Sequence, residues 1–174
     1  MNYMTRKALN AKHGPCSGVT YETADGLAID VCYHVSTKTR LHELWHYRHF
    51  DWDATLRPLE AKALNELDAN IYSQHTTGHT PTFTALLSVI AMMVCEAHQL
   101  TYRRHLLTYC FQSIVLVAAL RGISLTSRQR SFCWQQLKIG LSKSTAWDNM
   151  HIGADFRQNL HKREIPLDNI PRVC

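Results

Sequence analysis

The spacing of apolar residues along the chain predicts helices over most of its length. In the stretch 56–74 an apolar residue recurs every four positions, which places one side chain above the next on a single helix face: Leu59, Ala63, Leu67 and Ile71. Pro58 suits the first turn of this helix, since the amide hydrogen it lacks would have no helical partner there. Further apolar segments predict helices near 83–97, 100–120, 127–139 and 144–152, with breaks at Gly122 and Gly140.

The first fifty residues mix both kinds of secondary structure. Asn2 to Lys12 favours a short helix that stops at His13-Gly14-Pro15. Leu27 to Val35 follows an Asp-Gly turn signal and is rich in β-branched and apolar residues, which is typical of a strand. A helix capped by Ser36 or Thr37 is expected to run to Phe50. The pattern therefore predicts a mainly α fold with a small β-sheet, of the α+β class.

Length and composition favour a folded protein with one compact domain, residues 1–174. The chain has 174 residues, of which 45% are hydrophobic and 19% charged, and this is ordinary for a globular protein. Its six cysteines include no C-x-x-C pair and follow no secretory signal, so we expect reduced thiols and a cytoplasmic location. The apolar runs fall short of the roughly 20 residues that a membrane span needs. We therefore expect no membrane contact.

The segment His42-Glu43-Leu44-Trp45-His46 matches the pattern H-E-x-x-H on a predicted helix. Side chains four residues apart lie one above the other, so both imidazoles can reach one metal ion. Zinc suits these ligands, and it lowers the pKa of a bound water to about 7. Glu43 is then the predicted catalytic base, which takes a proton from that water.

The surrounding residues resemble the gluzincin peptidases, whose thermolysin branch carries H-E-x-x-H, nineteen intervening residues and N-E-x-x-S-D. In this chain nineteen residues separate His46 from Glu66, and Asn65, Ala69 and Asn70 stand at the matching places. The resemblance implies that Glu66 is the third zinc ligand. It also implies that Asn70 replaces the family aspartate that hydrogen-bonds a ligand histidine, without the charge that raises the ligand's basicity.

The short form HELWHY followed by E-x-x-A-N is also similar to the ImmA/IrrE-like intracellular peptidases, which cut repressors. This resemblance extends from the strand before the motif to Ser73. It implies a minimal zincin-like core at about 19–98, followed by a helical C-terminal part at about 99–174. The implied function is a zinc-dependent metallopeptidase that hydrolyses a protein or peptide substrate. The strand Leu27 to Val35 is a candidate edge strand for binding an extended substrate through backbone hydrogen bonds.

A second resemblance competes for the third ligand. Gly78-His79-Thr80-Pro81-Thr82-Phe83 resembles the G-H-G-P-x-F segment of Spartan/SprT-like peptidases, in which the histidine binds zinc. That family acts on proteins crosslinked to DNA, so this alternative implies His79 as a ligand and a substrate bound to DNA. Thr80 departs from the family glycine, and the gap from His46 is longer than the family's. The choice between Glu66 and His79 stays open.

The net charge of +5 adds one further candidate partner. Basic residues outnumber acids after residue 100 and suit contact with DNA or a DNA-binding protein: Arg103, Arg104, Arg121, Arg128, Arg130, Lys138, Lys143, Arg157, Lys162 and Arg163. A solvated helical surface explains the same residues equally well. A last alternative is a regulatory or binding protein whose H-E-x-x-H holds a structural zinc ion or arises by chance.

Overall fold

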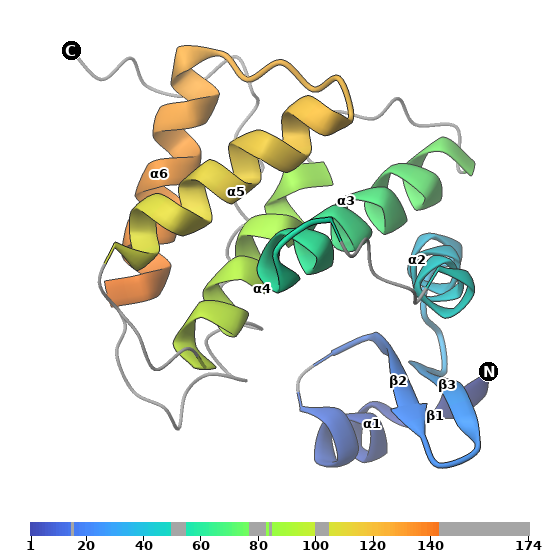
Figure 1. Ribbon diagram of the computed structural model, residues 1–174. Helices are drawn as coiled ribbons and strands as arrows, with labels where there is room; N and C mark the ends of the chain where they lie inside the picture. The colour runs from blue at the N-terminus through green and yellow to red at the C-terminus, as the bar shows by residue number, and fades with distance from the viewer. Residues whose placement is uncertain (15, 50–54, 77–82, 84, 100–104, 143–174) are drawn as a thin grey trace. The chain divides into compact units, whose positions relative to one another are not determined.

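The structure is a computed structural model that describes residues 1–14, 16–49, 55–76, 83, 85–99 and 105–142 (Figure 1). The chain divides into two compact units, residues 1–81 and 82–174. Helices dominate the described residues, and the strands among them form one three-stranded sheet. This confirms the predicted mainly α fold with a small β-sheet. The extent of a single domain, and of a zincin-like core at 19–98, stays a prediction.

The sheet lies in the first unit and has its longest strand in the middle. Strands β1 (Asn2–Met4), β2 (Gly18–Thr23) and β3 (Gly26–Cys32) follow the order β1-β3-β2. β3 is parallel to β1 and antiparallel to β2. β2 and β3 form a hairpin in which Thr23 pairs with Gly26, and Gly26 has a φ of 114°, which glycine adopts readily. β3 is therefore paired along both edges.

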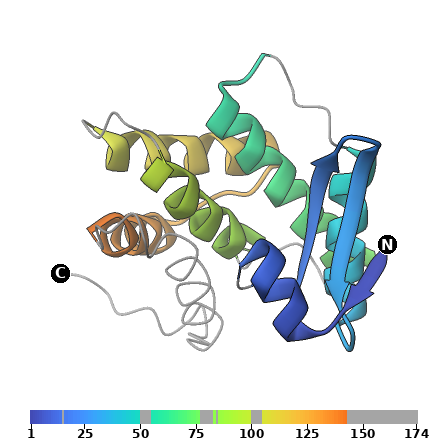
Figure 2. The same ribbon diagram turned by 90° about the horizontal axis from the view of Figure 1, so that it is seen from below.

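Helices cover both faces of this sheet (Figure 2). Because neighbouring side chains of a strand point to opposite faces, Asp30 faces α1 (Arg6–His13) while Val31 faces α2 (Thr37–Arg48). Ser36 caps α2 by accepting a hydrogen bond from the Thr39 amide at 3.1 Å. Helix α2 packs on α3 (Pro58–Thr76) and on β2. The H-E-x-x-H helix is thus held between the sheet and α3.

The predicted apolar face of α3 is confirmed. Leu59, Ala63 and Leu67 are buried, and Ile71 is partly exposed. Pro58 begins the helix, as its position predicts. Before it, the backbone N–H and the guanidinium of Arg57 both donate to the Glu60 carboxylate, which closes the first turn.

The second unit contains α4 (Ala85–Gln99), α5 (Leu106–Leu120) and α6 (Ser127–Ser142), which pack pairwise on one another. The larger apolar side chains that α4 buries fully are Leu86, Val89, Ile90, Met93 and Val94. Gly140 lies within α6 and faces α4, where an added Cβ would stand 2.6 Å from Val94 Cγ2. This close approach of two helices explains why a glycine is tolerated inside α6.

Four expectations are corrected by the structure. Asn2–Met4 forms a strand, so the first helix begins only at Arg6. The edge-strand hypothesis for Leu27 to Val35 is wrong, since β3 is central and ends at Cys32. Gly140 is not a break, because it packs inside α6. The second helix of the first unit ends at Arg48 rather than at Phe50.

Other expectations fall outside the described residues or concern membrane insertion. The predicted helix near 144–152 and the segment 100–104 are not described. Among the helices that are described, none combines the length and the apolar character that crossing a membrane requires.

Candidate metal centre

Two histidines one turn apart on α2 point toward the same place. The ring centroids of His42 and His46 are 4.6 Å apart with the planes nearly perpendicular, and their Nε2 atoms are separated by 3.0 Å. The four-residue spacing produces this geometry, because a helix places residues i and i+4 on one face. The predicted convergence of the two imidazoles is therefore present.

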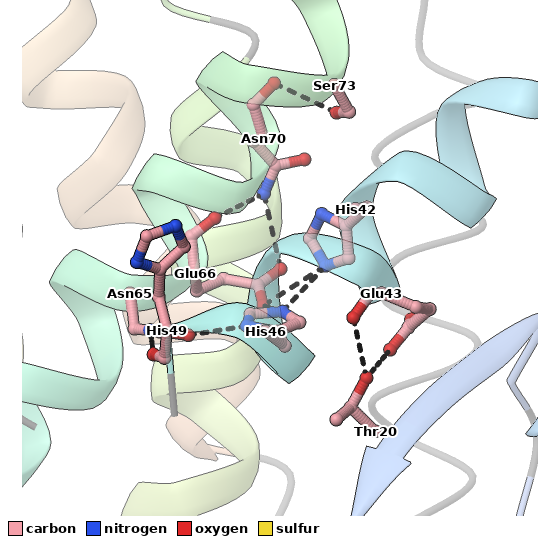
Figure 3. A network of polar contacts seen from close by, with 9 residues as sticks. All are labelled: Thr20, His42, Glu43, His46, His49, Asn65, Glu66, Asn70 and Ser73. Atoms are coloured by element: carbon pink, nitrogen blue, oxygen red, sulfur yellow. Dashed lines mark hydrogen bonds and ion pairs between the residues drawn. The ribbon is translucent and has the colours of Figure 1, made fainter. Parts of the chain in front are cut away.

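Helix α3 brings Glu66 to the same point. Glu66 Oε2 lies 3.5 Å from His42 Nε2 and 3.3 Å from His46 Nε2. The three side chains are 17–19% exposed, so the cluster is largely buried but open to solvent on one side. Figure 3 shows the convergence of these side chains from two helices. They form the one group of three or more potential metal ligands within the described residues.

The separations between the three atoms match those around a zinc ion. Ligand atoms at about 2.0–2.2 Å from a tetrahedral zinc ion are about 3.4 Å from one another. The observed separations are 3.0, 3.3 and 3.5 Å. Two imidazoles and one carboxylate also form a donor set that zinc prefers, and a fourth position remains for water. The residues present therefore fit the metal that the sequence predicts.

Asn65 fixes which nitrogen of His46 faces the cluster. Its Nδ2 donates to the backbone carbonyl of His49 at 2.6 Å, which turns its carbonyl oxygen Oδ1 toward His46 Nδ1. An amide oxygen only accepts hydrogen bonds, so Nδ1 of His46 carries the proton. The lone pair of His46 is then on Nε2, the atom that faces His42 and Glu66. Sequence reasoning gave Asn65 no role, although its place beside Glu66 on α3 offered a signal.

Asn70 contacts the carboxylate of Glu66. Its Nδ2 donates to the backbone carbonyl of Glu66 at 2.8 Å and to Glu66 Oε1 at 3.3 Å. This leaves Oε2 of Glu66 directed at the histidines. Asn65 contacts His46 in this structure, and the hydrogen bond to a histidine that the family resemblance implies for Asn70 stays a prediction.

Glu66 and His46 shift each other's pKa values in the direction that favours opposite charges. Burial raises the pKa of Glu66, but the adjacent His42 and His46 outweigh this effect and hold it well below its usual value. Burial lowers the pKa of His46, whereas its contacts with Glu66 raise it, and the net shift is upward. The carboxylate thus stays ionised and attracts positive charge into the cluster.

Glu43, the predicted base, faces the sheet side of α2. Its side chain is 7% exposed, and burial raises the pKa of its carboxyl group. The neighbouring His42 and His46 oppose this upward shift of the Glu43 pKa without cancelling it. Thr20 Oγ1 on β2 lies within hydrogen-bond distance of two oxygens of Glu43, Oε2 at 3.1 Å and the backbone carbonyl at 2.8 Å, and donates its one proton to either of them (Figure 3). Sequence reasoning missed Thr20, because it did not identify β2.

His49 lies near the cluster but outside it. It ends α2, is exposed, and stacks on Trp45 with ring centroids 4.0 Å apart. Trp45 also packs against Tyr72 of α3 at 5.1 Å, so the aromatic side chain joins the two helices that carry the ligands. These contacts hold the helices at the spacing that the cluster requires.

Several predicted site residues lie outside the described part of the chain. His79, the alternative third ligand, is one of them, so its rank against Glu66 stays a prediction. Of the basic residues that suggested DNA contact, the described ones occupy α6 and the loop before it: Arg121, Arg128, Arg130 and Lys138. Comparison with known proteins adds no family, since no family model, curated protein or solved structure matches this chain.

Proposed function

We propose that this chain is a zinc-dependent peptidase whose metal is held by His42, His46 and Glu66. The observation that carries the proposal is the spacing of the three ligand atoms, which corresponds to a tetrahedral zinc site. A structural zinc site has four protein ligands, whereas the described residues contribute three here. An open fourth position is the arrangement that hydrolytic zinc sites use.

Each residue has a distinct task in this proposal. The zinc ion would supply Lewis-acid chemistry, which polarises a peptide carbonyl and makes water a better nucleophile at neutral pH. Glu43 takes the proton from the attacking water on a carboxylate oxygen and passes it to the leaving amine. Asn65 keeps the lone pair of His46 on Nε2, and Asn70 directs the Glu66 carboxylate. A buried base with a raised carboxyl pKa suits proton transfer near neutral pH.

The substrate in this proposal is a protein segment in extended form. β2 is paired with β3 along one edge, and among the described strands none pairs with its other edge. Its unpaired backbone groups offer hydrogen bonds to an extended chain. β2 also contacts α2 through Thr20 and Glu43, so a segment lying along it would pass close to the base. This assigns to β2 the role that the sequence suggested for Leu27 to Val35.

The proposal also includes the cytoplasm as the compartment. Cys32, Cys110 and Cys133 carry free thiols, as expected where thiols stay reduced. Burial raises the pKa of Cys110 to about 11 and that of Cys133 to about 12, so these thiols are poor nucleophiles and have a packing role.

The decisive experiment combines metal analysis with cleavage of a fluorescently labelled unfolded protein. We expect one zinc ion per chain and cleavage in the parent protein. Glu43→Gln should retain zinc and lose activity by at least a hundredfold, because it removes the base and spares the ligands. A metal-free parent, or a Glu43→Gln variant as active as the parent, would contradict the proposal. Zinc binding that survives Glu66→Gln but is lost in His79→Ala would favour the Spartan-like alternative.

A further inference from the structure

A general base acts only when its carboxylate is correctly oriented, and the long side chain of Glu43 can adopt several orientations. Its two outer rotatable bonds allow several orientations of the carboxylate, and only some of them direct an oxygen at the reacting water. Burial limits these orientations but does not select among them. The contacts of Glu43 with β2 provide the missing selection.

Thr20 contacts Glu43 at two points. Its Oγ1 lies 2.8 Å from the Glu43 backbone carbonyl and 3.1 Å from Glu43 Oε2. The contact to the backbone carbonyl ties Thr20 to α2 itself, so the hydroxyl has a fixed place relative to the helix. The contact to Oε2 then holds one end of the carboxylate against that fixed point, as Figure 3 shows.

Gly18 on β2 makes room for the Glu43 side chain. It lies two residues before Thr20 on β2, on the same face of the strand. A Cβ atom at Gly18 would stand 2.8 Å from Glu43 Cγ and 3.2 Å from Glu43 Oε1. The absence of a side chain at Gly18 therefore leaves the space that the observed orientation of Glu43 occupies.

The Thr20 hydroxyl has one proton, so at any moment it donates either to the Glu43 backbone carbonyl or to Glu43 Oε2. Both acceptors belong to the same residue, so the hydroxyl holds Glu43 in place whichever oxygen it is bonded to.

From this geometry we infer that Thr20 is a positioning residue for Glu43. Strand β2 then fixes the orientation of the Glu43 carboxylate through Thr20 and Gly18. The inference rests on the proposed peptidase function. A merely structural contact between β2 and α2 would affect folding and leave turnover unchanged. A positioning contact affects turnover and leaves metal binding unchanged.

The test is the steady-state kinetics of zinc-loaded variants on a labelled peptide that the parent cleaves. Thr20→Val keeps the shape and the strand preference but removes the hydroxyl. We expect kcat to fall about ten- to a hundredfold, with KM within twofold and one zinc ion per chain. Thr20→Ser restores the hydroxyl and should return kcat to within about threefold of the parent.

Two further variants serve as matched tests. Thr23→Val makes the same change on the same strand, where the hydroxyl donates to the Gly26 carbonyl at 2.7 Å and is remote from Glu43. It should leave kcat unchanged. Gly18→Ala should lower kcat with zinc retained, because its methyl group displaces Glu43, and this keeps the inference testable should Thr20→Val fold poorly.

The outcomes separate the two ideas. A Thr20→Val variant with kcat within twofold of the parent overturns the inference while the peptidase proposal stands. So does an equal loss of kcat in Thr20→Val and Thr20→Ser, since the hydroxyl is then irrelevant. A parent that holds zinc but cleaves no peptide overturns the proposed function, and the inference fails with it.

Discussion

Asp30 and Glu66 of the first unit each lie at the centre of a cluster of polar side chains, and the two clusters differ in how the charge of the carboxylate is balanced. Asp30, 1% exposed, accepts hydrogen bonds or ion pairs of 2.7–3.0 Å from four side chains: Asn2, Lys12, His13 and Tyr21. Glu66 Oε2 instead faces two imidazole nitrogens at 3.3 and 3.5 Å, beyond good hydrogen-bond length. The hydrogen bonds of Asp30 balance its charge without a metal ion, whereas the atoms around Glu66 Oε2 have the spacing of ligands around a cation.

A structural ion cluster and a candidate metal site differ in which groups lower the pKa of the buried carboxyl group. In both clusters the pKa of the carboxyl group is lowered although burial opposes the shift. Around Asp30 the compensation comes from hydrogen bonds with Lys12, which is charged at neutral pH, and with His13, Asn2 and Tyr21. Around Glu66 the largest compensation comes from His42 and His46. A buried carboxylate whose neighbours lack a permanent positive charge is therefore the better metal candidate.

The largest expected effect is that of removing metal. A ligand that binds only the folded state adds about 4 kcal/mol to the free energy of unfolding when its free concentration is a thousandfold above Kd. We therefore expect a strong chelator to lower the urea midpoint of the zinc-loaded protein by a corresponding amount. Equilibrium urea denaturation with and without chelator measures it.

The matched controls for metal removal come from the two clusters. His42→Ala lacks a ligand, so its urea midpoint should not respond to the chelator. Asp30→Asn leaves the ligands intact and should respond as the parent does. An identical midpoint of the parent protein in both conditions would remove the distinction between the clusters.

The next largest effect is expected for Asp30→Asn. This change removes the negative charge that faces Lys12. It also replaces one accepting oxygen by an NH₂ group, which cannot accept the hydrogen bonds that the carboxylate accepts. Lys12 is about half exposed and is solvated by water once Asp30 loses its charge, so the cost comes from the mismatched hydrogen bonds at the buried side chain of residue 30. Denaturation of the metal-free protein should show a loss of about 2–3 kcal/mol. Zinc content should stay at one per chain.

The same substitution predicts a pH dependence with a definite sign. The hydrogen bonds of Asp30 hold its pKa in the folded protein well below the ordinary value of 3.8, so its stabilising effect is present above that value and is lost as pH falls. Between pH 5 and pH 3 the parent should lose about 1 kcal/mol more than Asp30→Asn. Chelator in both samples excludes a contribution from metal release. A constant difference between the two proteins would show that Asp30 titrates normally.

How far the sequence predicted the fold follows from the strength of each local pattern. The helix at 58–76 was predicted from its apolar spacing and Pro58, because both signals are local. The strand Asn2–Met4 was not, since three residues carry no periodicity and pair with β3 only through the tertiary fold. Gly140 was misread as a break because its role is contact with Val94, a residue far away in sequence.

The candidate site shows the same limit. His42, His46 and Glu66 were predicted as a group because helical spacing and the nineteen-residue interval carry their geometry. Thr20 was not, since its contact with Glu43 joins residues 23 positions apart across a strand that had no clear signal. Asn65 had a signal in its position beside Glu66, but its contact with His46 depends on how α2 and α3 pack.

Asn65→Ala is expected to have a smaller effect than Asp30→Asn, because it removes an uncharged partner of His46. In the Asp30 cluster His13 Nε2 faces a carboxylate at 2.8 Å, whereas in the His42–His46–Glu66 cluster His46 Nδ1 faces the amide of Asn65. Asn65→Ala removes the group that keeps the lone pair on Nε2, so zinc affinity should fall about tenfold, or about 1.4 kcal/mol. Competition with a chromophoric chelator measures this.

Asn10→Ala is the control for this last change. It makes the same substitution at an exposed position of α1, away from the ligands, and should leave zinc affinity unaltered. If Asn65→Ala binds zinc as tightly as Asn10→Ala does, the orientation of His46 is set by helix packing alone. Metal binding would then depend on His42, His46 and Glu66 without the amide of Asn65. The Asp30 cluster would differ in that each of its four neighbours contributes a hydrogen bond.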